Sequence, residues 1–128
     1  MGRRRDRGCP CGLPAAYDRC CGRVLAGAPA PTAELLMRSR YTAYARHDEA
    51  HLLASWHAST RPAAVPFDPE LRWTRLQVVA TAGGGLLDTA GEVHFRATYV
   101  RRGLVDVLEE RSRFAREDGR WTYVGPAS

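Results

Sequence analysis

The chain has 128 residues and a formal net charge of +5, and 45% of its residues are hydrophobic and 26% charged. These values are typical of one globular domain, with room for a small metal-organised appendage. No apolar run approaches the ~18 residues that a membrane-spanning helix needs, so the sequence predicts no segment that crosses a bilayer. All basic residues are arginines, and their excess favours acidic partners. No recognition-helix or aromatic ribonucleoprotein pattern accompanies it, so nucleic-acid binding is only weakly supported.

The segment before the first cysteine, residues 1–7, is basic and lacks the apolar stretch of a secretory signal. We therefore expect the protein to be cytoplasmic. Six of the arginines fall within residues 1–23, which concentrates positive charge at this end of the chain. In a reducing compartment, clustered cysteines favour metal or redox chemistry over a disulfide framework.

Four cysteines in the spacing C-x-C-x8-C-C predict a zinc site. These are Cys9, Cys11, Cys20 and Cys21. Zinc accepts four thiolates as a tetrahedron at ~2.3 Å, and this ligand set leaves no open position for a substrate, so the site would be structural. The alternatives are a disulfide within one of the pairs, which would form a small strained ring, and a redox thiol pair, which usually has the spacing C-x-x-C. Four bound thiolates and one divalent ion would lower the net charge to about +3.

Composition divides the chain into three parts. Residues 1–25 form the zinc module, since this Gly- and Pro-containing stretch is too short to hold a core without a metal. Residues 26–31 alternate Ala with Gly and Pro and are expected to form a linker. Residues 32–128 contain the periodic hydrophobic segments of a packed domain.

Two helices are expected first. Thr32 is a candidate N-cap for a helix that runs to about His47, with Arg40 inside its apolar face. Asp48 can cap a second helix, in which hydrophobic residues recur at helical spacing until Pro62. His47 and His51 lie near the junction and are expected at the surface.

From residue 71 the hydrophobic period changes to two, which predicts strands over roughly 71–81, 91–101, 104–115 and 120–125. Arg102-Gly103 and Asp118-Gly119 supply hairpin turns, so the strands should form a curled antiparallel meander. A two-residue loop at Asp118-Gly119 pairs Phe114 with Tyr123 and Arg116 with Trp121. The same alternation points Glu110 inward, whereas His94 points outward into solvent.

Five segments of the sequence are recognisable. The segment from Cys9 to Gly22, CPCGLPAAYDRCCG, closely resembles the SEC-C motif, which in the translocation ATPase SecA binds zinc, docks on the chaperone SecB and has been linked to ribosome contact. This resemblance implies a protein-binding module, with a ribosome or a chaperone-like client as possible partner. The segments LMRSRYTAY (36–44), WHASTRP (56–62), ERSRF (110–114) and EDGRW (117–121) are similar to the YchJ-like family. That resemblance implies an α+β fold in which a SEC-C knob precedes a nuclear-transport-factor-2-like cone, with helices packed on a curled antiparallel sheet.

Cones of this type leave a pocket at the wide end. Our candidate lining comprises Arg40, Tyr41, Tyr44, Trp56, His57, Arg61 and Glu110. His57 and Glu110 would form an acid–base pair, and an arginine would hold an anionic substrate. The alternative is purely structural: Arg40 and Glu110 form a buried ion pair, His57 satisfies a nearby carbonyl and Trp56 belongs to the core.

Two classes of function remain open from the sequence. In the first, the protein is an adaptor whose zinc knob contacts a protein partner, while the cone supplies a rigid body or a homodimer surface. In the second, it is an enzyme or small-molecule binder that uses the cone pocket. The adaptor is favoured, because the clearest chemical pattern lies in the knob and no complete catalytic constellation can be identified in the cone.

Overall fold

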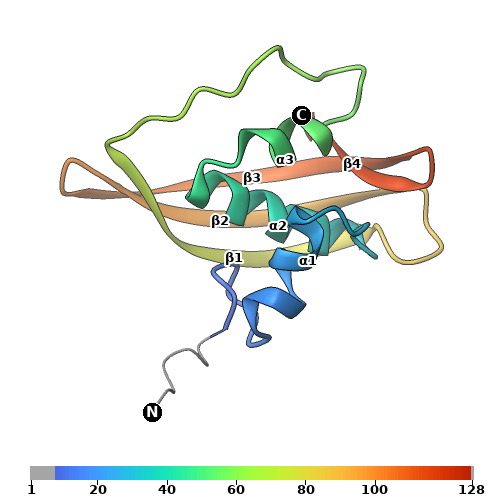
Figure 1. Ribbon diagram of the computed structural model, residues 1–128, viewed down its shortest axis with the longest axis horizontal. Coiled ribbons are helices and arrows are strands. Elements are labelled where there is room, and N and C mark those ends of the chain that lie inside the picture. The colour runs from blue at the N-terminus through green and yellow to red at the C-terminus, as the bar shows by residue number, and fades with distance from the viewer. Residues whose placement is uncertain (1–7, 128) are drawn as a thin grey trace.

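The structure is a computed structural model and describes residues 8–127. The basic residues 1–7, which include four of the six N-terminal arginines, lie outside the described residues. The chain begins with a short 3-10 helix, η2 (Tyr17–Arg19), and three α-helices: α1 (Cys21–Leu25), α2 (Ala33–Arg46) and α3 (Glu49–Ala54). Four strands follow (Figure 1): β1 (Leu71–Gly83), β2 (Ala90–Arg101), β3 (Leu104–Glu117) and β4 (Arg120–Pro126).

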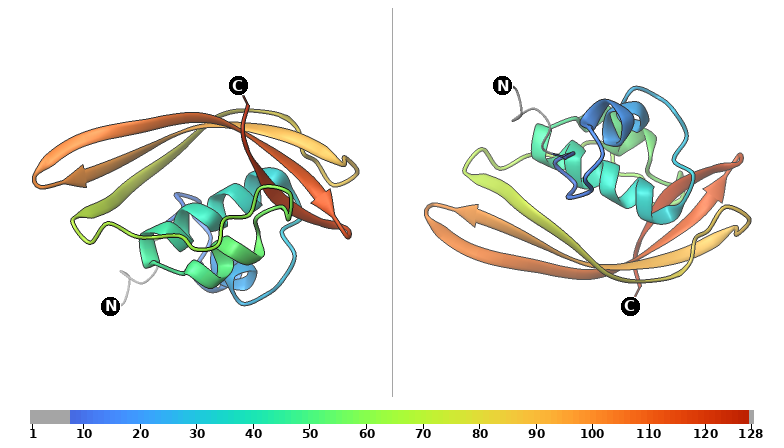
Figure 2. Two further views of the ribbon diagram at one scale, coloured as in Figure 1. Left: turned by 90° about the horizontal axis from the view of Figure 1, so that it is seen from above. Right: turned by 90° about the horizontal axis from the view of Figure 1, so that it is seen from below.

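The four strands form one antiparallel sheet in the order β1-β2-β3-β4, as the predicted meander requires. The sheet curls around the helices, so that α2 and α3 lie in its concave side (Figure 2). Two register shifts in β1, between Trp73 and Arg75 and between Val78 and Ala80, interrupt its pairing with β2. Such bulges bend a strand and increase its twist, which is how a sheet acquires this curvature. The predicted α+β cone is therefore confirmed.

The helix caps follow the sequence prediction. Thr32 Oγ1 accepts a hydrogen bond from Leu35 N at 3.1 Å, and Asp48 Oδ1 accepts one from His51 N at 3.0 Å. The second helix, α3, ends at Ala54 and not near Pro62 as expected. The backbone leaves the helix because it pairs with β4: Tyr123 N donates to Ser55 O, and His57 N donates to Tyr123 O, both at 2.8 Å.

The predicted register of the last hairpin is confirmed. Phe114 pairs with Tyr123 and Arg116 pairs with Trp121. Phe114 and Trp121 are only 2% and 3% exposed, because they face α2 on the concave side. On the convex face, His94 is not simply solvated as predicted: its Nε2 lies 2.6 Å from a carboxylate oxygen of Glu109 on the neighbouring strand.

The cysteines belong to the main core. Cys9, Cys11 and Cys21 are buried in one hydrophobic cluster with residues of α2 and the sheet, among them Leu36 and Leu76. Hence the N-terminal module packs against the cone and shares its core.

The segment expected to be a linker also packs against the cone. Ala30 is buried. Pro31 O accepts a hydrogen bond from Trp121 Nε1 at 3.3 Å, and Gly27 O accepts one from Arg120 Nη2 at 3.0 Å. Residues 26–31 therefore follow β4 closely, although their composition is that of a flexible connection.

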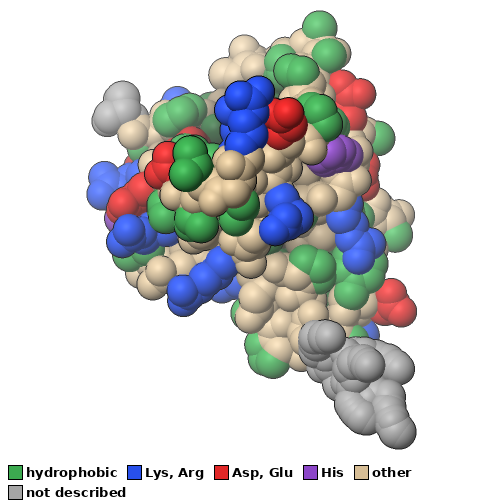
Figure 3. All heavy atoms as spheres, turned by 90° about the vertical axis from the view of Figure 1, so that its left-hand side faces the viewer, with side chains coloured by type: hydrophobic (Ala, Val, Ile, Leu, Met, Phe, Trp, Pro, Cys, Tyr) green, Lys and Arg blue, Asp and Glu red, His purple; other side chains and the backbone are tan. Residues whose placement is uncertain are grey.

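Large hydrophobic side chains remain exposed at the β2–β3 hairpin, which extends beyond the helices at one end of the molecule (Figure 1). They are Leu104, Val105, Val107 and Leu108. The space-filling view from that side shows hydrophobic and arginine side chains interspersed on the surface (Figure 3). A homodimer stays a prediction, and this hairpin offers it apolar surface. No helix among residues 8–127 has the length and apolarity needed to cross a membrane.

The confirmed register gives a sharp stability test between two neighbouring residues of β3. Replacing the buried Phe114 with Ala should lower the free energy of unfolding by about 3–5 kcal/mol, because it leaves a cavity between sheet and helix. Replacing the adjacent, exposed Arg113 with Ala should change it by less than about 0.5 kcal/mol. Urea denaturation monitored by tryptophan fluorescence measures both. Equal effects of the two changes would show that the alternation along β3 is wrong.

Candidate metal centre and cone cavity

The four cysteines come together from two short segments. Cys9 and Cys11 lie in a turn in which Gly12 N donates to Cys9 O at 3.0 Å, and Gly12 has the positive φ of 100° that glycine adopts without strain. Cys20 and Cys21 lie at the start of α1. The four sulfur atoms all lie within 4.8 Å of one another. The structure thus brings together all four residues that the spacing selects.

The geometry of the cluster fits a tetrahedral ion. Sulfurs at about 2.3 Å from a central ion stand about 3.8 Å apart in a regular tetrahedron. The sulfurs of Cys11 and Cys20 are 3.7 Å apart. All four thiols are free in this structure, so it contains no disulfide between these cysteines. The cluster is therefore compatible with metal binding, and its ligand set would be closed.

The surroundings also fit a bound cation. The Cys21 hydrogen bond holds the pKa of Cys11 at about 5, which makes Cys11 the readiest thiolate. Burial, followed by the Cys11 contact, raises the pKa of Cys20 to about 12, and the Cys11 contact and burial raise the pKa of Cys21. A bound divalent ion would lower these pKa values again, because it compensates the charges of neighbouring thiolates. The buried Thr42 hydroxyl has no hydrogen-bond partner among residues 8–127. It acts to lower the pKa of Cys21, so it is placed to donate a hydrogen bond to the Cys21 thiolate.

A second site lies between α2 and the concave face of the sheet. It is a cavity of about 240 Å³. Its lining is mainly aromatic and apolar and comprises Met37, Arg40, Tyr41, Tyr44, Trp73, Phe95, Ala97, Leu108, Glu110, Ser112, Phe114 and Tyr123. Four residues of the candidate pocket therefore line one cavity, namely Arg40, Tyr41, Tyr44 and Glu110.

Glu110 is fixed in the cavity by two neighbours on the sheet. Its Oε2 accepts hydrogen bonds from Ser112 Oγ at 2.6 Å and from Tyr123 Oη at 3.0 Å. Burial raises the pKa of Tyr123, so this phenol stays protonated and donates at neutral pH. Two donors to one oxygen fix the orientation of the carboxyl group.

Arg40 is buried beside the cavity but does not form the predicted ion pair with Glu110, because its partners lie elsewhere. Its Nη1 donates to Leu52 O at 2.9 Å and to Ser55 Oγ at 2.7 Å. Its guanidinium carbon lies 4.4 Å from the ring centre of Tyr123 and 4.7 Å from that of Trp56, within range of cation–π attraction. Burial lowers the pKa of Arg40 to about 10, which still leaves it charged at neutral pH.

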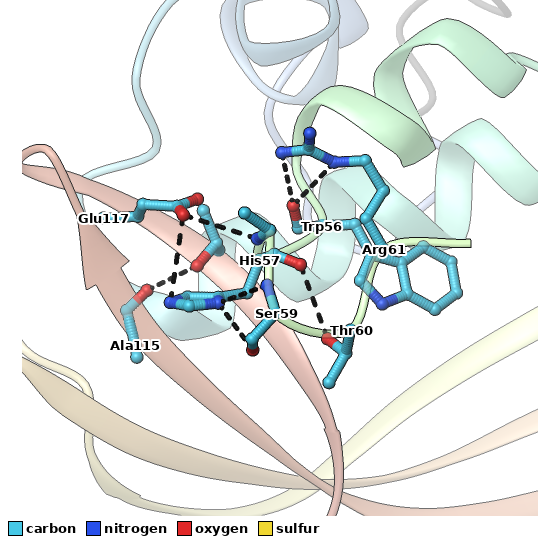
Figure 4. Close-up of polar contacts among 9 residues, drawn as sticks. Trp56, His57, Ser59, Thr60, Arg61, Ala115 and Glu117 are labelled. Carbon is cyan, nitrogen blue, oxygen red and sulfur yellow. Dashed lines mark hydrogen bonds and ion pairs between the residues drawn. The ribbon is translucent and has the colours of Figure 1, made fainter. Parts of the chain in front are cut away.

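The other predicted pocket residues lie outside the cavity, and the proposed acid–base pair is wrong. His57 Nδ1 lies 2.8 Å from Ser59 Oγ, and its Nε2 faces Glu117 at 4.0 Å (Figure 4). Arg61 donates from Nε and Nη2 to Trp56 O. These positions follow from the early end of α3, after which residues 55–57 pair with Tyr123 of β4.

Two kinds of cavity residue were not among the predicted pocket residues. Ser112 and Tyr123 are the hydrogen-bond partners of Glu110. Trp73 and Phe95 carry the same period-two signal on β1 and β2. The alternation indicates which residues face the concave side. The bulges in β1 interrupt this alternation, so the sequence does not show which β1 and β2 residues lie side by side.

His51 is half-buried and not a surface residue as expected. Its Nε2 lies 2.9 Å from Ser39 Oγ, which the preceding helix presents to it. Burial, with a smaller contribution from the nearby charge of Arg40, lowers the pKa of His51 to about 4. Hence the folded protein holds this imidazole in its neutral form.

Fold and site together define an α+β cone of the nuclear-transport-factor-2 type with an N-terminal four-cysteine cluster that is compatible with metal binding. Residues 32–126 match the family model described as "YchJ, middle NTF2-like domain". The chain belongs to this YchJ family. It is 57% identical over 117 residues to a UPF0225 protein of Streptomyces avermitilis, covering 91% of this chain and 81% of that protein. It is 53% identical to a UPF0225 protein of Streptomyces coelicolor, covering 91% of each.

Solved structures agree with this assignment. The solution structure of a SEC-C motif containing protein from Rhodopseudomonas palustris superimposes with a TM-score of 0.82 at 32% identity, covering 94% of this chain and 98% of that one. The crystal structure of a sec-c motif containing protein from Psychrobacter arcticus gives a TM-score of 0.76 at 22% identity, covering 96% and 83%, and supports the fold alone.

Metal removal should destabilise the whole protein, because the cysteines lie in the core of the cone. We expect a zinc chelator to lower the melting temperature by at least about 10 °C in a single transition, since the metal-binding free energy is part of the folding free energy. Calorimetry with and without chelator measures this, and added zinc should restore the transition. A cone transition that is unchanged by the chelator would show that the module folds separately.

The neutral His51 should make the protein less stable in mild acid. Above about pH 6.5 this histidine is uncharged in both the folded and the unfolded chain. Between about pH 6.5 and pH 4 only the unfolded chain takes up a proton at His51, so the free energy of unfolding falls as the pH falls. Urea unfolding of the native protein and of His51→Gln at about pH 7 and about pH 5 measures this. The native protein should lose more stability over the interval. An equal loss in both would assign the acid sensitivity to other groups.

Proposed function

We propose that this protein is a zinc-dependent, cytoplasmic protein-binding adaptor. The observation that carries the proposal is a groove of about 250 Å³ directly beside Cys20 and Cys21. Its floor and walls combine apolar side chains with two arginines and comprise Leu13, Ala15, Arg19, Cys20, Cys21, Arg23, Val24, Ala28, Pro29, Pro31 and Leu35. The groove therefore lies where the metal module, the segment 26–31 and α2 meet.

The chemistry of the groove defines its partner. Arg19 and Arg23 are exposed and have no ion-pair partner among residues 8–127. An apolar groove with two free cations at its border suits an apolar side chain of a partner that is flanked by Asp or Glu. A protein client that presents such a segment, on a ribosome or in a chaperone-like complex, is the partner class we propose.

Zinc would act here as a structural element. Cys9, Cys11, Cys20 and Cys21 would hold it with no open coordination position, so the ion would support the groove and contact no substrate. Two groove residues, Cys20 and Cys21, are members of the metal cluster, so the shape of the groove depends on the metal. The anionic cluster beneath the arginines would also keep their side chains close to the groove.

An enzymatic function has less support. His57 and Glu110, the proposed acid–base pair, are not brought together: His57 faces Ser59 and Glu117, whereas Glu110 is held by Ser112 and Tyr123. The cone cavity therefore contains charged groups for recognition but lacks the assembled proton shuttle that the sequence analysis expected.

Site-specific photo-crosslinking in cells tests the adaptor. A photoreactive phenylalanine analogue replaces Ala15 in the groove and, as a matched control, Thr74 on the exposed surface of β1. We expect a discrete set of crosslinked proteins from position 15 only, rich in Asp and Glu near the crosslink. The charge-reversing pair Arg19→Glu and Arg23→Glu should reduce the yield at least tenfold, because it replaces attraction by repulsion.

Two controls make this result specific. The pair Arg111→Glu and Arg113→Glu reverses the same number of exposed charges on the convex face and should leave the yield unchanged. Melting temperatures of all variants should agree, because these side chains are exposed. Equal crosslinking from positions 15 and 74, or crosslinks that survive charge reversal at the groove, would contradict the adaptor.

A further inference from the structure

The cone cavity contains one positive and one negative side chain that do not touch. Arg40 and Glu110 both line it, yet no ion pair joins them within 4.0 Å among the described residues 8–127. Opposite charges in one small, partly desolvated space normally pair, because the attraction grows as water is excluded. Here other contacts hold them apart.

Each charge is fixed by partners that use only part of its bonding capacity. Arg40 uses Nη1 for Leu52 O and Ser55 Oγ, and the Tyr44 hydroxyl is its polar neighbour in the cavity; Nε and Nη2 form no hydrogen bond of normal length among residues 8–127. Glu110 uses Oε2 for Ser112 and Tyr123, while its Oε1 has no partner among the same residues. A donor pair and an acceptor thus stay available in a prearranged geometry, which reduces the ordering cost of binding.

The space between these two charges is bounded by rings. Trp73 packs edge-on against Tyr41 and Tyr44, with ring centres 6.3 and 6.5 Å apart, and Phe114 packs edge-on against Tyr123 at 5.7 Å. Aromatic faces accept both apolar groups and cations. The volume of about 240 Å³ lies below the range of about 300–1,000 Å³ that is typical of larger ligands.

We propose that the cone cavity is a binding site for a small zwitterion with an apolar body, of the size of an apolar amino acid. Its ammonium group binds Glu110 Oε1, its carboxylate binds Nε and Nη2 of Arg40, and its apolar part lies against the rings of Trp73, Tyr41 and Tyr44. The neutral sum of the two protein charges matches a ligand without net charge. The site includes no residue of the groove, so this inference is independent of the adaptor function.

The two charges make a clear prediction about ligand analogues. An analogue that lacks the amino group leaves Glu110 desolvated without a partner, and one that lacks the carboxylate does the same to Arg40. A charge that the bound ligand covers without giving it a partner weakens binding, and we expect a loss of at least tenfold.

Fluorine NMR of the full-length, zinc-loaded protein labelled with 5-fluorotryptophan tests the proposal. Trp73 lines the cavity, and its resonance is assigned by Trp73→Phe; Trp121 serves as an internal reference outside the cavity lining. The probes are L-leucine with 4-methylpentanoate and 3-methylbutylamine, and L-phenylalanine with 3-phenylpropanoate and 2-phenylethylamine. In each set the second compound lacks the amino group and the third lacks the carboxylate. We expect one or both amino acids to shift the Trp73 resonance in a saturable way, with at least tenfold weaker effects from their analogues.

Two variants connect the affinity to the charges. Glu110→Gln should weaken the amino acid at least tenfold but should not weaken the amine-free analogue, which no longer leaves a charge without a partner. Glu109→Gln, one residue away on the convex face, should change neither. Arg40→Lys keeps the charge but removes the forked donor pair, and should weaken the amino acid and the amine-free analogue together. The melting temperature of each variant identifies any loss of folding, and the comparison of analogues within one variant remains valid at a lower stability.

Three outcomes would overturn the inference. The first is that neither amino acid shifts Trp73 at millimolar concentration. The second is that an analogue with a single charge binds as tightly as its parent amino acid. The third is that Glu110→Gln and Glu109→Gln have the same effect on affinity. None of these results bears on crosslinking at the groove, so the failure of one proposal can be distinguished from failure of the other.

Discussion

Helix α2 is the element on which both halves of the molecule depend. One part of its surface packs against the module, where Arg38 Nη1 donates to Cys11 O at 2.8 Å. Another part faces the sheet, where Arg40 and Tyr41 line the cone cavity. Because a helix is rigid over its 14 residues, its position relative to the sheet and its position relative to the cysteines cannot vary independently. The metal module is therefore a part of the cone's core.

This shared core also explains why residues 26–31, which their composition predicts to be a linker, pack against the cone. Ala, Gly and Pro form flexible connections when nothing contacts them, and no sequence pattern announces that Pro31 O will accept a hydrogen bond from Trp121, 90 positions later. The caps at Thr32 and Asp48 and the register of the last hairpin could be predicted, since each rests on residues close in sequence. Rules that use residues close in sequence thus predicted the helices and strands. The contacts between the module and the cone join residues far apart in sequence, and these rules do not predict them.

The candidate sites show the same division. The four cysteines lie within 13 residues, and zinc chemistry constrains them strongly, so their spacing was sufficient to group them. The cavity collects residues from α2 and all four strands, and only the alternation along each strand indicated which of them face inward. His57 was assigned to it because hydrophobic spacing suggested a longer second helix. Pairing of residues 55–57 with β4 ended that helix and removed His57 from the site.

The two sites differ in how their charged groups are arranged: the thiols converge, whereas Arg40 and Glu110 are held apart. In the N-terminal module four thiols converge within 4.8 Å, so their thiolates would need a cation held among them, and such a site would be closed to substrates. In the cone, Arg40 and Glu110 are each anchored by the protein yet kept apart, so part of their bonding capacity remains for something else. A protein that only needed stability would gain little from a buried Arg40 that forms no ion pair among residues 8–127, because desolvating a charge costs several kcal/mol. The proposed recognition in the cone would use this free bonding capacity, and a metal ion held by the cysteines would stabilise the helix that carries Arg40.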